Sequence, residues 1–211
     1  MSLSYAVEPM EQYLAVSESI DWKTPAVLQQ AKRLASGTND PFSISQACFE
    51  FVRDEIKHSW DYQQNPVTYK ASEVLLHQTG YCYAKSHLLA ALLRANGLAA
   101  GLCYQRLTIS DDQPPFCLHG LNAVYLPEIG WYRIDARGNK EGVDAQFTPP
   151  IEQLAFPVIT PGEVDFKEIL SEPLPQITEL LSRSLSYQEL ADNLPDMETI
   201  QSLSSTYLQQ V

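Results

Sequence analysis

The sequence of 211 residues lacks an apolar run of the roughly 20 residues that a membrane-spanning helix needs. Its best stretch, residues 88–102, is interrupted by Arg94 and Asn96. The beginning of the chain also lacks the basic segment and the apolar segment of a secretory signal peptide, and carries Glu8 and Glu11 instead. We therefore expect a cytoplasmic protein without a membrane partner.

Basic residues are scarce as well. Fourteen Lys and Arg stand against 26 Asp and Glu, which gives a formal net charge of −12. No cluster of Lys and Arg offsets this charge locally, so the phosphates of a nucleic acid or of an anionic membrane would be repelled. The charge therefore excludes nucleic acid as a partner and is most simply explained by solubility.

Only four cysteines are present, at positions 48, 82, 103 and 117. A chain of this length can build a core without disulfides, and we expect free thiols in a reducing compartment. The sequence contains neither a Cys-x-x-Cys pair nor a His-Glu-x-x-His motif, so it gives no support to a structural zinc site. We expect no metal and no organic cofactor.

Helical patterns fill the first half of the chain, and strand patterns follow them. The segment 82–96 is the strongest helix, because it is rich in Ala and Leu, is apolar almost all round and ends before Gly97. Residues 127–130 are typical of a hairpin turn, and residues 108–116 are expected to form an exposed acidic loop. The other expected helices are residues 25–37, 41–56, 71–76, 177–185 and 187–193, and the expected strands are 4–7, 98–107, 117–126, 131–135 and 143–147.

This order of elements predicts an α+β fold in which N-terminal helices pack on an antiparallel sheet. No linker is long or polar enough to divide the chain, so we expect a single domain over residues 1–211. Its core covers about residues 40–150, and residues 151–211 form an extended wrapping segment that ends in helices.

Three residue types suited to nucleophilic catalysis stand at structured positions. Cys82 begins the strongest helix, where free N–H groups and the positive end of the helix dipole stabilise a thiolate. His119 lies on the first strand of the hairpin and can take up the thiol proton. Asp135 ends the next strand and can fix the far ring nitrogen of the imidazole. If both strands turn these side chains to one face and the helix packs on that face, the three meet. The backbone N–H of Cys82 would then stabilise an oxyanion.

Within residues 71–135, the short sequence phrases around these three residues resemble the transglutaminase-like superfamily of papain-type cysteine enzymes. The resemblance implies a Cys-His-Asp triad in which Cys82 is the nucleophile, His119 the acid and base, and Asp135 the orienting carboxylate. It also implies acyl transfer from a peptide or protein amide, either to water, as in a peptidase or amidase, or to an amine. The matching phrases are Gly80-Tyr81-Cys82, Leu92-Leu93-Arg94-Ala95-Asn96-Gly97, His119 and Trp131-Tyr132-Arg133-Ile134-Asp135.

The sequence departs from the family pattern beside the expected site. Leu121 stands where many members have Trp, and Ala136-Arg137 stand where many have Pro-Thr. Arg137 could hold a substrate carboxylate or be an exposed turn residue. The aromatic residue that some members place at the oxyanion hole has three candidates here, which are Trp60, Tyr62 and Tyr69.

Other interpretations remain open. The fold could serve as a catalytically silent module that binds a peptide or protein. Cys117, two residues before His119, should share its face of the strand and could join Cys82 in a redox pair or a metal site. Asp144 is an alternative third member of the triad, and the other three histidines are expected to be surface or packing residues.

Overall fold

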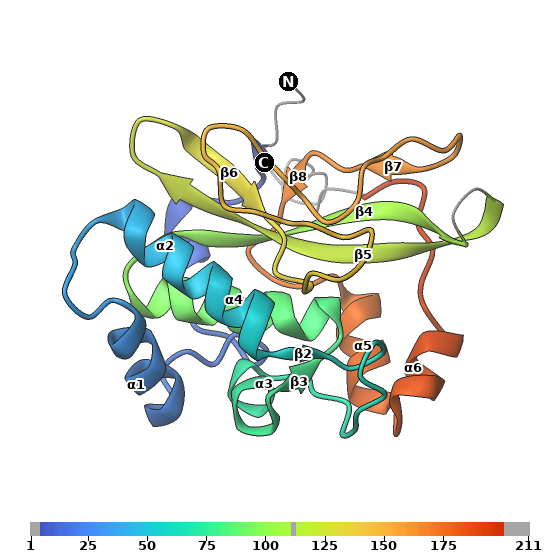
Figure 1. The fold of residues 1–211 in the computed structure, drawn as a ribbon, viewed down its shortest axis with the longest axis horizontal. Helices are drawn as coiled ribbons and strands as arrows, with labels where there is room; N and C mark the ends of the chain where they lie inside the picture. Colours follow the sequence, from blue (N-terminus) through green and yellow to red (C-terminus); the bar gives the residue numbers. More distant parts are fainter. Residues whose placement is uncertain (1–4, 111–112, 201–211) are drawn as a thin grey trace, which may run out of the picture.

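The computed structural model describes residues 5–110 and 113–200. An antiparallel sheet with strand order β6-β5-β4-β7 lies over a layer of helices (Figure 1). The helices are α1 (Pro25–Leu34), α2 (Pro41–Glu50), α3 (Ala71–His77), α4 (Cys82–Ala95), α5 (Pro175–Arg183) and α6 (Tyr187–Asp192), with helical turns η1 (Met10–Leu14) and η2 (Phe51–Glu55). The strands are β1 (Tyr5–Ala6), β2 (Lys57–His58), β3 (Thr79–Gly80), β4 (Ala100–Ser110), β5 (Gln113–Leu126), β6 (Gly130–Ile134), β7 (Val164–Asp165) and β8 (Glu168–Ile169).

Helix α4 is the centre of the fold, as its composition predicts. Every one of its residues except the last is buried, because the sheet covers one side and α1, α2 and α3 pack around it (Figure 1). Its start is set by Tyr81, which has extended backbone, and its end is followed by Gly97 with a φ of +77°. Within the described ranges no helix combines the length and the apolar character needed to cross a membrane.

The helices before α4 begin as the sequence predicts. Pro25 and Pro41 occupy first helical positions, where a missing N–H costs nothing. The side chain of Asp40 accepts a hydrogen bond from the Ser43 backbone N–H at 2.8 Å and caps α2. Helix α2 ends at Glu50 and continues as a π-helical turn through η2, so the segment expected as one helix over 41–56 changes its winding halfway.

The hairpin of β4 and β5 is longer than predicted: residues 108–110 and 113–116 are largely exposed, as expected, but they form strand ends and not a loop. Pairing continues to Thr108 opposite Phe116 and Ser110 opposite Gln113, while residues 111–112 lie outside the described ranges. Glu163, far along the chain, accepts hydrogen bonds from both the backbone N–H and the hydroxyl of Thr108. This contact with the tail gives the strand ends a partner that the local sequence does not reveal.

The tail contributes strands before its two helices. β7 adds to the free edge of β4, with Gln105 opposite Asp165, and β8 pairs in parallel with β1 near the beginning of the chain. The expected strand at 143–147 is wrong, because this segment forms only isolated bridges. The helices α5 and α6 confirm the expected helical extension.

A buried arginine joins the two ends of the described chain to the core. Arg94, on α4, is 2% exposed, and its guanidinium donates to the backbone carbonyls of Ala15 at 2.8 Å and Ser171 at 2.6 Å. It also donates to the Ala100 carbonyl at 2.9 and 3.1 Å. One side chain therefore satisfies three carbonyl groups from distant parts of the sequence.

Candidate active site

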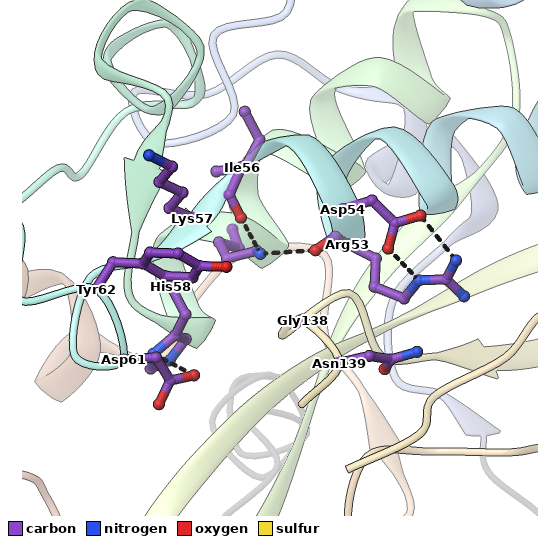
Figure 2. Close-up of a pocket in the computed structure, with 10 residues that line it drawn as sticks. Arg53, Asp54, Ile56, Lys57, His58, Asp61, Tyr62, Gly138 and Asn139 are labelled. Carbon is purple, nitrogen blue, oxygen red and sulfur yellow. Dashed lines mark hydrogen bonds and ion pairs between the residues drawn. The ribbon is translucent and has the colours of Figure 1, made fainter. Parts of the chain in front are cut away.

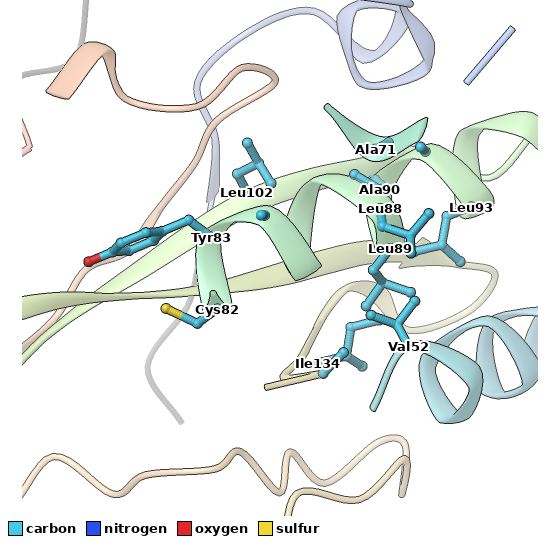
Figure 3. Close-up of a cluster of buried hydrophobic side chains, with 14 of the residues drawn as sticks. Val52, Ala71, Cys82, Tyr83, Leu88, Leu89, Ala90, Leu93, Leu102 and Ile134 are labelled. Carbon is cyan, nitrogen blue, oxygen red and sulfur yellow. The ribbon is translucent and has the colours of Figure 1, made fainter. Parts of the chain in front are cut away.

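Cys82 is the first residue of α4, as predicted. Figure 3 shows its sulfur at the start of the helix, away from the leucines that pack toward Val52 and Ile134. The preceding Gly80 belongs to β3 and pairs with His58 of β2. A Cβ on Gly80 would lie 3.2 Å from the Thr68 hydroxyl, so glycine here serves the packing of the chain itself. The helix start presents free N–H groups beside a thiol that is only 3% exposed.

His119 and Asp135 meet where β6 ends. The last pair between β5 and β6 is Asn122 with Ile134, so Asp135 leaves β6 beside the part of β5 that carries His119. Nε2 of His119 lies 2.8 Å from Oδ2 of Asp135, and both side chains are buried. The structure therefore brings the predicted imidazole and carboxylate into direct contact.

The carboxylate of Asp135 is fully hydrogen-bonded. Its Oδ1 accepts the backbone N–H of Arg137 at 3.1 Å, and its Oδ2 accepts that of Ala155 at 3.2 Å in addition to the His119 ring. Burial alone would raise the pKa of Asp135, but His119 and these two N–H groups outweigh it and lower the pKa. Asp135 therefore stays ionised without access to water.

The Cys82 side chain lies close enough to His119 to contribute, after Asp135, to raising the pKa of its ring. Nε2 is engaged by Asp135, which leaves Nδ1 as the ring nitrogen that can exchange a proton with the thiol. Burial would lower the pKa of His119, but the Asp135 carboxylate, together with Cys82, raises it. The Asp135 carboxylate therefore stabilises the protonated form of the ring relative to the neutral form.

The way in which the helix reaches His119 differs from the expectation. Even-numbered residues of β5 face α4, as the bond from the Asn122 side chain to the Ser86 carbonyl at 2.9 Å shows. By alternation, His119 leaves the strand on the opposite face. The expectation that α4 packs on the face of His119 is therefore wrong. Because β6 ends at Ile134, the edge of β5 beside His119 is left without a β6 partner, and this edge is the route by which Cys82 could approach the imidazole.

Close approach of α4 to β5 depends on Gly120. A Cβ at this position would lie 2.8 Å from a ring carbon of Tyr83, the residue after Cys82. The Tyr83 hydroxyl also donates a hydrogen bond to the Leu118 carbonyl. The start of α4 is thus seated on one short segment of β5, beside the histidine.

Arg137 is neither an exposed turn residue nor free to hold a substrate carboxylate. It is 8% exposed and forms a two-pronged ion pair with Asp61, at 2.6 and 3.1 Å. Its guanidinium lies 5.5 Å from the centre of the Phe156 ring, and that ring meets the His119 ring edge-on with centroids 5.0 Å apart. Arg137 and Phe156 therefore form a packed wall behind the imidazole.

A polar pocket that the sequence reasoning missed adjoins this wall, because its lining residue Asp61 is the ion-pair partner of Arg137. It measures about 150 Å³ and includes His58, Asp61 and Lys85 (Figure 2). His58 is 4% exposed, and its Nδ1 lies 3.7 Å from Asp61. Burial lowers the pKa of Lys85 to about 7, and its amine donates to the carbonyls of Ile56 and Arg53 at the end of η2. The spacing of His58 and Asp61 beside a polar loop was the available signal.

The remaining candidates lie apart from the triad geometry. All four cysteines are free, and Cys117 is partly exposed whereas Cys48 and Cys103 are buried. Asp144 is exposed and bonds to Asn139 and two glutamine side chains. Among the aromatic candidates for an oxyanion hole, Trp60 packs on Tyr187, Tyr62 lines the His58 pocket, and Tyr69 packs on His87. Over the described part of the chain, no group of three or more His, Cys, Asp and Glu could hold a metal ion.

The comparison with protein families identifies the class. A model described as the transglutaminase-like superfamily matches residues 28–136, which is more than half of the chain, and the chain therefore belongs to this superfamily. The matched region contains Cys82, His119 and Asp135. Among curated protein sequences, none matches this chain significantly.

Three solved structures are similar to parts of this chain. A protein from Cytophaga hutchinsonii described as a candidate cysteine protease is 16% identical, with a TM-score of 0.50 over 61% of this chain and 42% of its own. The periplasmic domain of TgpA from Pseudomonas aeruginosa is 18% identical, with a TM-score of 0.45 over 59% of this chain and 45% of its own. Red sea bream transglutaminase is 14% identical, with a TM-score of 0.37 over 60% of this chain and 26% of its own. The chain spans less than half the length of each.

Proposed function

We propose that this protein is a cysteine-dependent acyl-transfer enzyme that acts on amide bonds of a peptide or protein. Cys82 is the nucleophile, His119 the general acid and base, and Asp135 the carboxylate that orients the ring. The observation that supports this proposal is the contact between the His119 imidazole and the buried Asp135 carboxylate, close to a cysteine that begins the central helix.

The chemistry divides into two steps. Proton transfer from the Cys82 thiol to Nδ1 of His119 gives a thiolate, which attacks the amide carbonyl carbon. The C–N bond breaks as the imidazolium gives its proton to the departing nitrogen, and a thioester remains. A water molecule or an amine then attacks the thioester, His119 takes up its proton, and the C–S bond breaks to restore the thiol. These steps need no cofactor.

Charge in the transition state is stabilised at the helix start. The tetrahedral intermediate places a negative oxygen close to the sulfur, where the free backbone N–H groups of α4 begin, and that of Cys82 is the nearest in the chain. Asp135 supports the imidazolium that forms in the first step, because its three hydrogen bonds keep it ionised and fixed. The arrangement suits any amide whose carbonyl can reach the sulfur.

Hydroxylamine trapping tests this proposal whatever the natural acceptor is, because hydroxylamine itself attacks the thioester. A library of peptides that contain Gln, Asn and internal peptide bonds is incubated with the protein and hydroxylamine, and hydroxamates are detected by mass spectrometry. We expect product with the wild type and with Cys117→Ala, a matched loss of a neighbouring thiol, and none with Cys82→Ala. Equal product with Cys82→Ala and wild type would contradict the proposal.

One observation favours a second candidate. The Cys82 side chain belongs to a residue that is 3% exposed, so a carbonyl group has little direct access to it. A module of this fold that binds a peptide without turning it over would tolerate such closure. Tight binding of a peptide from the library, with no hydroxamate from any of them, would favour this alternative.

A further inference from the structure

One edge of β5 is covered by a neighbouring strand along only part of its length. β4 pairs with β5 along its whole length, whereas β6 covers the other edge only from Asn122 to Leu126. Tyr125 donates its N–H to the Ala99 carbonyl, so odd-numbered residues of β5 point their backbone groups toward β4. Leu118 and Gly120 consequently present theirs to the edge that β6 leaves open.

The chain's own tail occupies part of this open edge. Residues 194–197, here called the strap, follow α6 and form neither helix nor strand. The Pro195 carbonyl accepts the Leu118 N–H at 2.8 Å, as a neighbouring strand would. The next residue, Asp196, places its two carboxylate oxygens 2.5 and 2.7 Å from the guanidinium of Arg106 on β4. A main-chain bond and a charged side-chain contact therefore hold the strap in register.

The receiving surface for the strap is built independently of it. Arg106 is 8% exposed, lies 3.9 Å from the centre of the Phe116 ring, and donates to the Gly162 carbonyl at 2.6 Å. These contacts orient the guanidinium toward the strap. Asp196, in contrast, keeps a side chain that is 41% exposed. The arginine is thus a fixed, partly desolvated receptor for a carboxylate, and the strap is the more loosely held partner.

The strap and the beginning of α4 contact the same residue of β5. Leu118 donates its N–H to the Pro195 carbonyl, and its own carbonyl accepts a hydrogen bond from the hydroxyl of Tyr83. Tyr83 directly follows Cys82 in α4. Burial raises the pKa of Cys117, and the nearby Cys82 and Asp196 raise it further, so both groups lie in the neighbourhood of Cys117. A peptide that approaches Cys82 along the open edge would meet the strap first.

We propose that the open edge of β5 is a docking edge for an extended, acidic peptide, and that residues 194–197 occupy it as a resident ligand that covers Cys82. The substrate pairs its main chain with Leu118 and Gly120 and places a carboxylate side chain on Arg106, displacing the strap. This inference rests on the proposed function, since it names the class of its substrate, and it explains why the thiol is closed while the strap is in place.

Thiol labelling of the full-length protein tests the inference without requiring turnover. Iodoacetamide modification of each cysteine is followed by mass spectrometry in the wild type and in Asp196→Asn. Loss of this half-exposed ion pair should raise the labelling rate of Cys82 by about fivefold. Asp192→Asn removes the same charge from exposed α6 and should leave the rate unchanged, and Cys103, buried on the far face of the sheet, should stay unlabelled in all variants.

Peptides then test the docking edge itself. Acetyl-NLPDME-amide, which copies residues 193–198, should slow the labelling of Cys82 in Asp196→Asn, whereas acetyl-NLPNME-amide should not. In Arg106→Gln, Cys82 should label faster than in the wild type and neither peptide should protect it. An unchanged rate in Asp196→Asn would overturn the proposal, and so would equal protection by the two peptides. A protein that fails to form hydroxamates can still give the expected labelling, so the two proposals fail separately.

Discussion

Nε2 of His119 lies 2.8 Å from Oδ2 of Asp135, and two backbone N–H groups hold that carboxylate in place. The Phe156 ring meets the imidazole edge-on from the side. The ring therefore has one available orientation, with Nδ1 toward Cys82. Under the proposed function, the reactivity of the thiol depends on this fixed geometry as much as on the presence of the three residues.

Replacing Asp135 with Asn should lower the reactivity of Cys82 by roughly 100-fold or more, because an amide no longer supports the imidazolium or fixes the tautomer of the ring. The rate of Cys82 carboxymethylation at neutral pH measures this effect. Asp144→Asn is the matched control, since Asp144 is an exposed carboxylate that lies close to Asp135 in the sequence. Similar rates in both variants would assign Asp135 a purely structural role.

The pairing of His119 and Asp135 should make stability depend on pH. The pKa of Asp135 is lowered, so its contribution is present above the usual value of 3.8 and is lost as the pH falls further. The pKa of His119 is raised, so its contribution is complete below the usual value of 6.5 and is lost as the pH rises toward its folded value. The unfolding free energy lost in His119→Gln should therefore be larger at about pH 6 than at about pH 10. Urea denaturation at both values provides the measurement, and equal losses would count against the ion pair.

Gly120→Ala should destabilise the protein by about 1–3 kcal/mol, because the added methyl group overlaps the ring of Tyr83. The shift should also displace the beginning of α4 and slow the labelling of Cys82. A double-mutant cycle with Tyr83→Leu separates the clash from other causes: the double variant should lose less stability than the sum of the single variants. Strict additivity would show that the contact is not the origin of the effect.

Arg94→Met should cost on the order of 3 kcal/mol, since it leaves three buried carbonyl groups without their donor. Arg94→Lys should recover only part of this loss, because an ammonium group cannot span all three acceptors. Arg33→Met, at an exposed position of α1, serves as the control in urea denaturation. Equal stability of Arg94→Met and Arg33→Met would remove the proposed role of the guanidinium.

Much of the site could be predicted because its determinants are local. Helix α4 follows from its Ala and Leu content and from Gly97, and the hairpin follows from alternation and a turn. These elements place Cys82, His119 and Asp135 at a helix start, on a strand and at a strand end. What the sequence could not provide was the side of approach, since the contact between Cys82 and His119 depends on where β6 stops.

The features that sequence reasoning missed depend on distant partners. Arg137 can be buried because its charge is paired with that of Asp61. This partner lies 76 positions earlier in the chain, so no local sequence pattern reveals it. β7 consists of two residues, too few to show a period, and its position is set by pairing with Gln105 and Arg106. The extension of the hairpin beyond residue 107 likewise involves a distant partner, Glu163, which the local sequence does not reveal.

The three carbonyl acceptors of Arg94 have a consequence for how the protein is made. A chain that has been synthesised only as far as Asp135 already contains the central helix and the hairpin, but Ser171 has not yet joined the guanidinium of Arg94. Fragments that stop before this residue should be assembly intermediates and not miniature enzymes. The region after the family-matched segment is thus a condition for finishing the core, and truncation studies should keep it.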